Sequence, residues 1–136
     1  MQYFIMCAVE PASSEAWTTE AGRWREAGAF LQVNYGSLLG RYGEAPRKRA
    51  LTFLERGWVD LFSTDFHGRP HLPLYIDEAE EALGELGGSE QFDILARWNP
   101  ARLLEGGELL SAPPLAGKQG LREKVLNLLK RKRWGI

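Results

Sequence analysis

Three stretches of the chain have the length and apolar character of β-strands. Residues 3–9 form a continuous apolar run, whereas residues 30–34 and 59–65 begin with apolar side chains and end on polar ones. Short apolar runs of this kind are typical of parallel strands that are buried on both faces. The pattern therefore predicts three strands, two of which deliver polar side chains at their carboxyl ends.

Between and after these strands, apolar residues recur at the helical spacing of three and four positions. A helix is predicted to start at Ser13 or Ser14, a second near Ala45, a third after Pro73 and a short fourth at Ser89. Asn99 and Pro100 are read as the cap and first-turn proline of a further helix that ends at Gly106. In the second helix the basic run 47–49 is predicted to face solvent.

The alternation of strands and helices predicts an α/β fold with a parallel sheet and helices outside it. Residues 1–106 would form this part, followed by a linker over 107–118 that contains Pro113 and Pro114. A basic amphipathic helix is predicted over 119–136. Its terminal Lys and Arg side chains are favourable at a helix C-terminus, and a contact with nucleic acid or an acidic membrane is the alternative explanation.

Composition narrows the class of protein. The 136 residues are 44% hydrophobic and 26% charged, as in an ordinary soluble domain, and the net charge of −1 argues against general nucleic-acid binding. The single Cys7 excludes an internal disulfide and fits a reducing cytoplasm. No apolar run has the length of a membrane span, so a cytoplasmic protein is expected.

The candidate chemistry follows the third predicted strand, where Asp65, His67, Gly68 and Arg69 occur together. If the backbone stays extended, Asp65 and His67 point to the same face and can bind one metal ion. Gly68 permits a turn, and Arg69 offers a planar pair of donors for phosphate. The arrangement predicts the metal and phosphate end of a hydrolase site, although a simple Asp–His hydrogen bond beside a turn would use the same residues.

Polar side chains also end the second predicted strand. Gln32 and Asn34 share a face, and a buried amide without a partner costs about 1–3 kcal/mol. Either these amides line a binding site at the end of the strand, or they are satisfied by neighbouring backbone groups.

Four collinear segments carry a resemblance to a known family: the run 31–40 (LQVNYGSLLG), the helix end 55–57, the segment 59–70 and the pair 99–100. Over roughly residues 23 to 105 the chain resembles the C-terminal portion of the PHP-type (polymerase and histidinol phosphatase) tyrosine-protein phosphatases of bacterial capsule and exopolysaccharide loci. The resemblance implies a partial (β/α) barrel of three parallel strands with outer helices.

The resemblance also implies a manganese-dependent protein-tyrosine phosphatase that acts on a phosphotyrosine protein such as a bacterial tyrosine kinase. Asp65 and His67 fall on the family's last pair of metal ligands, and Arg69 on an arginine that binds the substrate phosphate; Asn34 is a further candidate for substrate binding. His71 corresponds to no ligand of the family.

The H-x-H pair of the family's opening strand and its other ligands are not found in the chain, so the metal site is expected to be incomplete. The alternative function is therefore that of a catalytically inactive remnant that serves as a binding or regulatory module. A partial barrel would also expose strand edges, which predicts self-association or a complementing chain.

Overall fold

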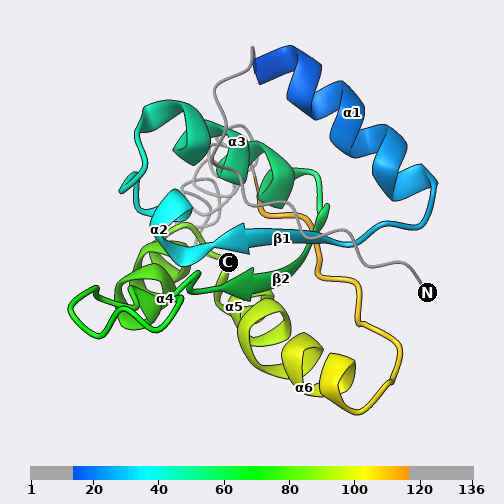
Figure 1. Ribbon diagram of the computed structural model, residues 1–136. Helices are drawn as coiled ribbons and strands as arrows, with labels where there is room; N and C mark the ends of the chain where they lie inside the picture. Colours follow the sequence, from blue (N-terminus) through cyan, green and yellow to red (C-terminus); the bar gives the residue numbers. More distant parts are fainter. Residues whose placement is uncertain (1–13, 117–136) are drawn as a thin grey trace, which may run out of the picture.

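The computed structural model describes residues 14–116. The elements, in chain order, are α1 (Ser14–Glu26), β1 (Leu31–Asn34), α2 (Tyr35–Leu38), α3 (Glu44–Glu55), β2 (Val59–Ser63), α4 (Ile76–Glu85), α5 (Ser89–Asp93), the π-helical turn η1 (Ile94–Trp98) and α6 (Asn99–Leu104) (Figure 1). The strand predicted over 3–9 and the helix predicted over 119–136 lie outside the described residues.

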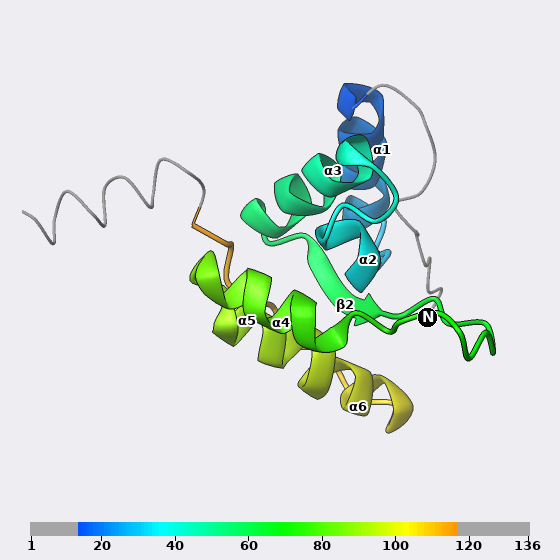
Figure 2. The same cartoon turned by 90° about the vertical axis from the view of Figure 1, so that its left-hand side faces the viewer.

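β1 and β2 lie side by side and parallel, in a two-stranded sheet. Helices α1, α2 and α3 lie on one side of β2 and helices α4, α5 and α6 on the other (Figure 2). The mixed α/β class and two of the predicted parallel strands are therefore confirmed. The last residues of the strands, Asn34 and Ser63, are partners in the register, so both strands end at the same edge of the sheet.

The hydrophobic core lies between the sheet and the helices. Its centre is a group of three aromatic rings, Tyr35, Phe62 and Phe92, with centroids 5.3 to 6.0 Å apart. Aromatic pairs at such distances add packing energy beyond the area that they bury. Burial raises the pKa of the Tyr35 hydroxyl. The three rings pack α2, which directly follows β1, against β2 and α5, and so hold the strand ends in place.

A helix segment starts at Asn99, as predicted, but Asn99 is not its cap, because the chain is already helical before it. α5, η1 and α6 follow one another without a break, and Asn99 itself has helical angles of φ −66° and ψ −42°. Pro100 cannot donate a backbone hydrogen bond, and the wider turn at Ile94–Trp98 directly precedes it. Asn99 is thus an interior helix residue, and its side chain is free to bind elsewhere.

The prediction of a solvent-facing run at 47–49 fails at Arg49. This side chain is only 4% exposed, whereas Lys48 is exposed as expected. The reason is the helical period, since Arg49 lies next to Ala50 and Phe53 on the face that α3 buries. Burial lowers the pKa of Arg49.

After α6 the chain returns across the molecule as an irregular segment, residues 107–116, which we call the strap. Ala112 and Leu115 of the strap are buried. The Leu115 N–H donates to the Leu54 carbonyl at 2.8 Å, and the Gln91 side chain donates to the Pro114 carbonyl at 3.3 Å. The part of the predicted linker that the structure describes is therefore packed against α3 and α5.

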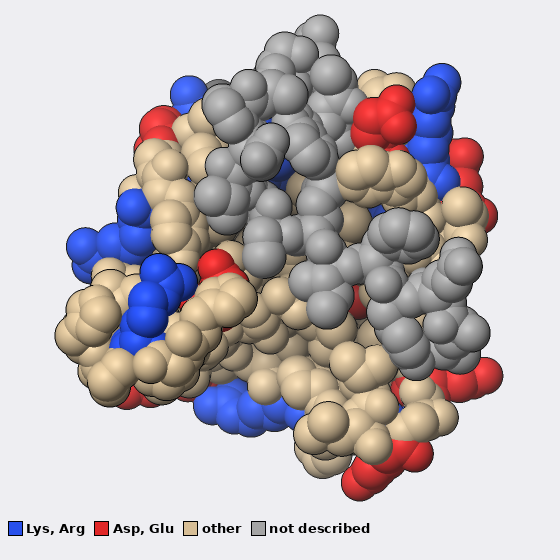
Figure 3. All heavy atoms as spheres, in the orientation of Figure 1, with Lys and Arg blue, Asp and Glu red and all other residues tan. Residues whose placement is uncertain are grey.

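In the described part of the chain, no helix combines the length and the apolar character that crossing a membrane requires. On the face shown in Figure 3, basic and acidic side chains are interspersed around the rim of the molecule rather than gathered into one patch.

Candidate metal and phosphate site

A chain of polar contacts joins the ends of the two strands. Gln32 Nε2 donates to Ser63 Oγ at 2.7 Å, and Ser63 Oγ donates to Asn34 Oδ1 at 3.1 Å. The two amides are therefore linked through a side chain of the neighbouring strand. Asn34 lies at the carboxyl end of β1, where the sequence predicts a binding site, but its side chain is fully buried. Its contact with Ser63 links the ends of the two strands.

Asp65 and His67 lie beside each other in the loop that follows β2. Asp65 Oδ1 is 2.5 Å from His67 Nε2, and the two side chains are 28% and 68% exposed. A carboxylate oxygen and an imidazole nitrogen are both suitable ligands for divalent metals such as manganese. Neighbouring ligands in an octahedral shell lie about 3 Å apart, so Asp65 Oδ1 and His67 Nε2 would have to move only slightly apart to bind the same ion.

The backbone conformation that brings Asp65 and His67 together differs from the predicted extended strand. β2 ends at Ser63, and Asp65 and His67 both have left-handed conformations, with φ +52° and +50°. The expectation of an extended strand through residue 65 is therefore wrong. Non-glycine residues adopt this conformation rarely, and such strain is found most often at functional sites.

Arg69 lies just beyond this pair. Gly68 makes a turn with φ +66°, and the Arg69 N–H donates to the Phe66 carbonyl at 3.1 Å. The Arg69 side chain is exposed and makes no hydrogen bond or ion pair with the residues that the structure describes. His71, also exposed, follows on the same loop. The exposed guanidinium of Arg69, two residues after His67 in the chain, is thus accessible to an anion.

Among the side chains that the structure describes, those of residues 19–116, no third His, Cys, Asp or Glu joins Asp65 and His67 in an arrangement that could hold a metal ion. The donor types fit manganese, but two ligands leave most of the coordination shell to water. The described residues thus supply two donors of suitable type, and any further ligands would have to come from elsewhere.

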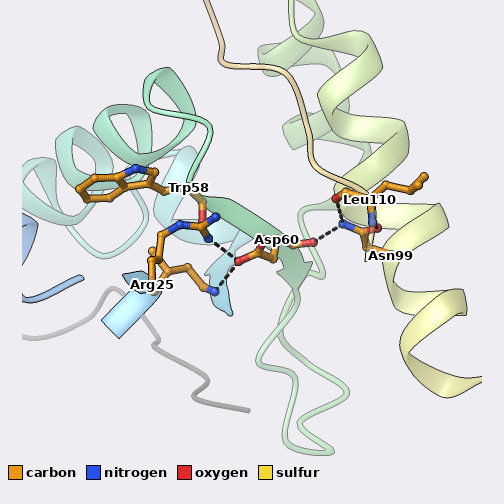
Figure 4. A network of polar contacts seen from close by, with 6 residues as sticks. Arg25, Trp58, Asp60, Asn99 and Leu110 are labelled. Carbon is orange, nitrogen blue, oxygen red and sulfur yellow. Dashed lines mark hydrogen bonds and ion pairs between the residues drawn. The ribbon is translucent and has the colours of Figure 1, made fainter. Parts of the chain in front are cut away.

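A partly buried ion pair holds the other end of β2, near its start. Asp60 Oδ2 accepts hydrogen bonds from Arg25 Nη1 at 2.6 Å and from the Leu31 N–H at 2.8 Å (Figure 4). Arg25 also donates to the Trp58 carbonyl. Burial raises the pKa of the Asp60 carboxyl, and its hydrogen bonds with Leu31 and Arg25 oppose this rise. The contacts fix the start of β1 against β2.

The sequence analysis missed the role of Asn99 in the same network. Asn99 Nδ2 donates to the Asp60 carbonyl at 2.8 Å and to the Leu110 carbonyl at 2.9 Å, while Asn99 Oδ1 accepts from the Leu110 N–H at 2.7 Å (Figure 4). The amide thus bridges β2 and the strap. The charged Asp60 inside an apolar run was the available signal, because a buried charge needs partners.

The sequence was compared with known protein families and with curated proteins. A family model described as "Capsular polysaccharide synthesis, CpsB/CapC" matches residues 15–105, which is more than half of the chain. The matched range contains both strands, the Asp65–His67 pair and Arg69. The comparison with curated proteins gives no match.

Proposed function

The chain belongs to the CpsB/CapC family of capsular polysaccharide synthesis, and we propose that it acts as a metal-dependent protein-tyrosine phosphatase of the PHP type. The observation that carries the proposal is the contact of Asp65 with His67 in the loop that follows the carboxyl end of β2, a loop that also contains the exposed Arg69. In parallel α/β folds, ligands and catalytic groups gather at this end of the strands.

Each of the three side chains has a distinct role in the proposal. Asp65 and His67 would hold manganese through a carboxylate oxygen and the imidazole Nε2. Bound metal would supply Lewis-acid polarisation of the phosphoryl group and an activated water. Arg69 would donate its paired N–H groups to the phosphoryl oxygens of phosphotyrosine. These hydrogen bonds would orient the phosphoryl group and neutralise the negative charge on its oxygens. The substrate would be a phosphotyrosine protein such as a bacterial tyrosine kinase, met in the cytoplasm.

Parallel strands joined through a helix fit the proposed (β/α) barrel, of which the described residues supply two strands. Further metal ligands would have to come from outside these residues, either from the chain itself or from a second chain. The proposal therefore includes self-association or a complementing chain as the route to a complete site.

The test is the release of phosphate from a phosphotyrosine peptide with and without manganese. Asp65→Ala and His67→Ala are each expected to abolish the manganese-dependent rate, because each removes a ligand. His71→Ala is the matched control, since His71 is an exposed histidine on the same loop and should leave the rate unchanged. A rate that survives both ligand substitutions would refute the site assignment.

The second candidate function is a binding or regulatory module without catalysis. It is favoured by one observation, the lack of a third suitable ligand near Asp65 and His67 among the described side chains of residues 19–116. In that case the chain would bind a phosphotyrosine peptide more tightly than its unphosphorylated form but release no phosphate. Arg69→Ala should weaken this binding, and manganese should not affect it. Fluorescence anisotropy of labelled peptides distinguishes the two functions.

A further inference from the structure

The loop that carries Asp65, His67 and Arg69 runs from Thr64 to Tyr75, and we call it the site loop. Residues 67–74 are all exposed, so the middle of the site loop has little packing to hold it. Its conformation is nevertheless unusual, because Tyr75 at its end is left-handed with φ +62°. Such backbone persists only where the surroundings hold it, so the ends of the loop must be fixed.

The end at Tyr75 is held from two sides. Its ring packs against the edge of the hydrophobic core, and its carbonyl accepts the Ala79 N–H at 3.1 Å, in the first turn of α4. On the other side, the guanidinium carbon of Arg41 lies 5.0 Å from the centroid of the Tyr75 ring. This distance is typical of a cation–π contact.

Arg41 itself belongs to the loop that follows β1 and α2. Its N–H donates to the Gly36 carbonyl at 2.9 Å, and Gly40 before it turns the chain with φ +75°. The backbone of Arg41 is therefore fixed by the end of α2. In Figure 1 this loop and the site loop leave the sheet at the same end. The Arg41–Tyr75 contact thus joins the loop after β1 to the loop after β2.

We propose that Arg41 is a positioning residue, which stacks on Tyr75 and so fixes the far end of the site loop that presents Asp65, His67 and Arg69. The stacked guanidinium holds the Tyr75 ring against the core and keeps the left-handed turn in place. The consequence for metal binding rests on the proposed function, whereas the effect on the order of the loop does not.

The order of the site loop can be measured directly by NMR relaxation of backbone amides in the full chain. Arg41→Ala is expected to lower the order parameters over residues 64–74 to values below about 0.6, typical of flexible backbone. Tyr75→Leu should do the same, and Tyr75→Phe, which keeps the ring, should restore the wild-type values. Arg56→Ala is the matched control, since Arg56 stacks on Trp58 at 4.8 Å away from the site loop.

A second measurement is the affinity for Mn²⁺ alone, followed by the electron paramagnetic resonance signal of the free ion. Arg41→Ala is expected to weaken this affinity about two- to fivefold, the range that an exposed cation–π contact can supply. Its thermal midpoint should stay close to that of Arg56→Ala, so that general destabilisation is excluded.

The outcomes separate this proposal from the proposed function. A site loop that is equally ordered in Arg41→Ala and in the wild type would overturn the positioning role, whatever the metal does. If the wild type binds no Mn²⁺ but Arg41→Ala releases the loop, the positioning role stands and the metal-dependent function fails. A loop that loosens with no change in Mn²⁺ affinity would overturn the part of the proposal that concerns the ligands.

Discussion

Replacing Asn99 with alanine removes the link between β2 and the strap. The Asn99 amide makes three hydrogen bonds, one to the Asp60 carbonyl and two to the backbone of Leu110. Each such bond contributes about 0.5–1.5 kcal/mol net, and a buried group left without a partner costs about 1–3 kcal/mol. Asn99 is fully buried and Asp60 is 8% exposed, whereas water reaches Leu110, which is half-buried. We therefore expect Asn99→Ala to lower the free energy of unfolding by about 3 kcal/mol.

Urea unfolding followed by tryptophan fluorescence measures this loss. With a slope of about 1–2 kcal/mol per molar urea, the midpoint should fall by about 1.5–3 M. Gln91→Ala is the matched control, because Gln91 also lies in a helix and donates a single, longer hydrogen bond to the same strap, at 3.3 Å to the Pro114 carbonyl. It should cost about 1 kcal/mol. Equal losses in the two variants, or a loss below 1 kcal/mol for Asn99→Ala, would refute the bridging role.

Three further predictions concern stability. Burial raises the folded-state pKa of Asp60 above its ordinary value of about 3.9, so the contribution of Asp60 to stability is greatest in acid and falls as the pH rises through the folded pKa. The unfolding free energy of the wild type minus that of Asp60→Asn should therefore decrease from pH 3 upward. An increase of this difference would contradict the prediction. Ser37→Ala should raise stability by about 1 kcal/mol, because the buried Ser37 hydroxyl has no hydrogen-bond partner among the described residues; a lower thermal midpoint would show that the hydroxyl has a partner. Gly57→Ala should lower the free energy of unfolding more than Gly68→Ala, since both glycines are left-handed but only at Gly57 would a Cβ lie 3.2 Å from Pro114. The left-handed backbone alone should cost each variant about 1–2 kcal/mol. Equal denaturant midpoints for the two variants would show that the strap moves away from the new Cβ without loss of stability.

The sequence predicted the elements whose signals are local. The strands at residues 31–34 and 59–63 and the helices before, between and after them follow from apolar periodicity. The Asp65–His67 pair was predicted on the assumption of an extended strand, yet the two side chains meet through a left-handed turn. A dihedral angle of this kind at a non-glycine residue leaves no mark in the pattern of apolar positions, so the backbone route could not be read from the sequence.

Contacts between distant segments were not predicted. Asn99 reads as a helix cap because a proline follows it, and only the fold shows that its amide bonds with Leu110 and β2. Arg49 lies in a basic run, which usually faces water, and only the packing of α3 shows that it is buried. The pairing of Arg41 with Tyr75 joins residues that are far apart in the chain. Tertiary geometry decides each of these cases.

The strap also bears on where a recombinant fragment should stop. The family match ends at residue 105, but Ala112 and Leu115 complete the core, and Leu115 shares a backbone hydrogen bond with Leu54. A fragment that ends at residue 105 would lack Ala112 and Leu115, so the core residues that they cover would be exposed to solvent, and Asn99 would lose its hydrogen bonds with Leu110. Expression designs should therefore extend to at least residue 116, because the unit that folds is longer than the segment by which its relatives are identified.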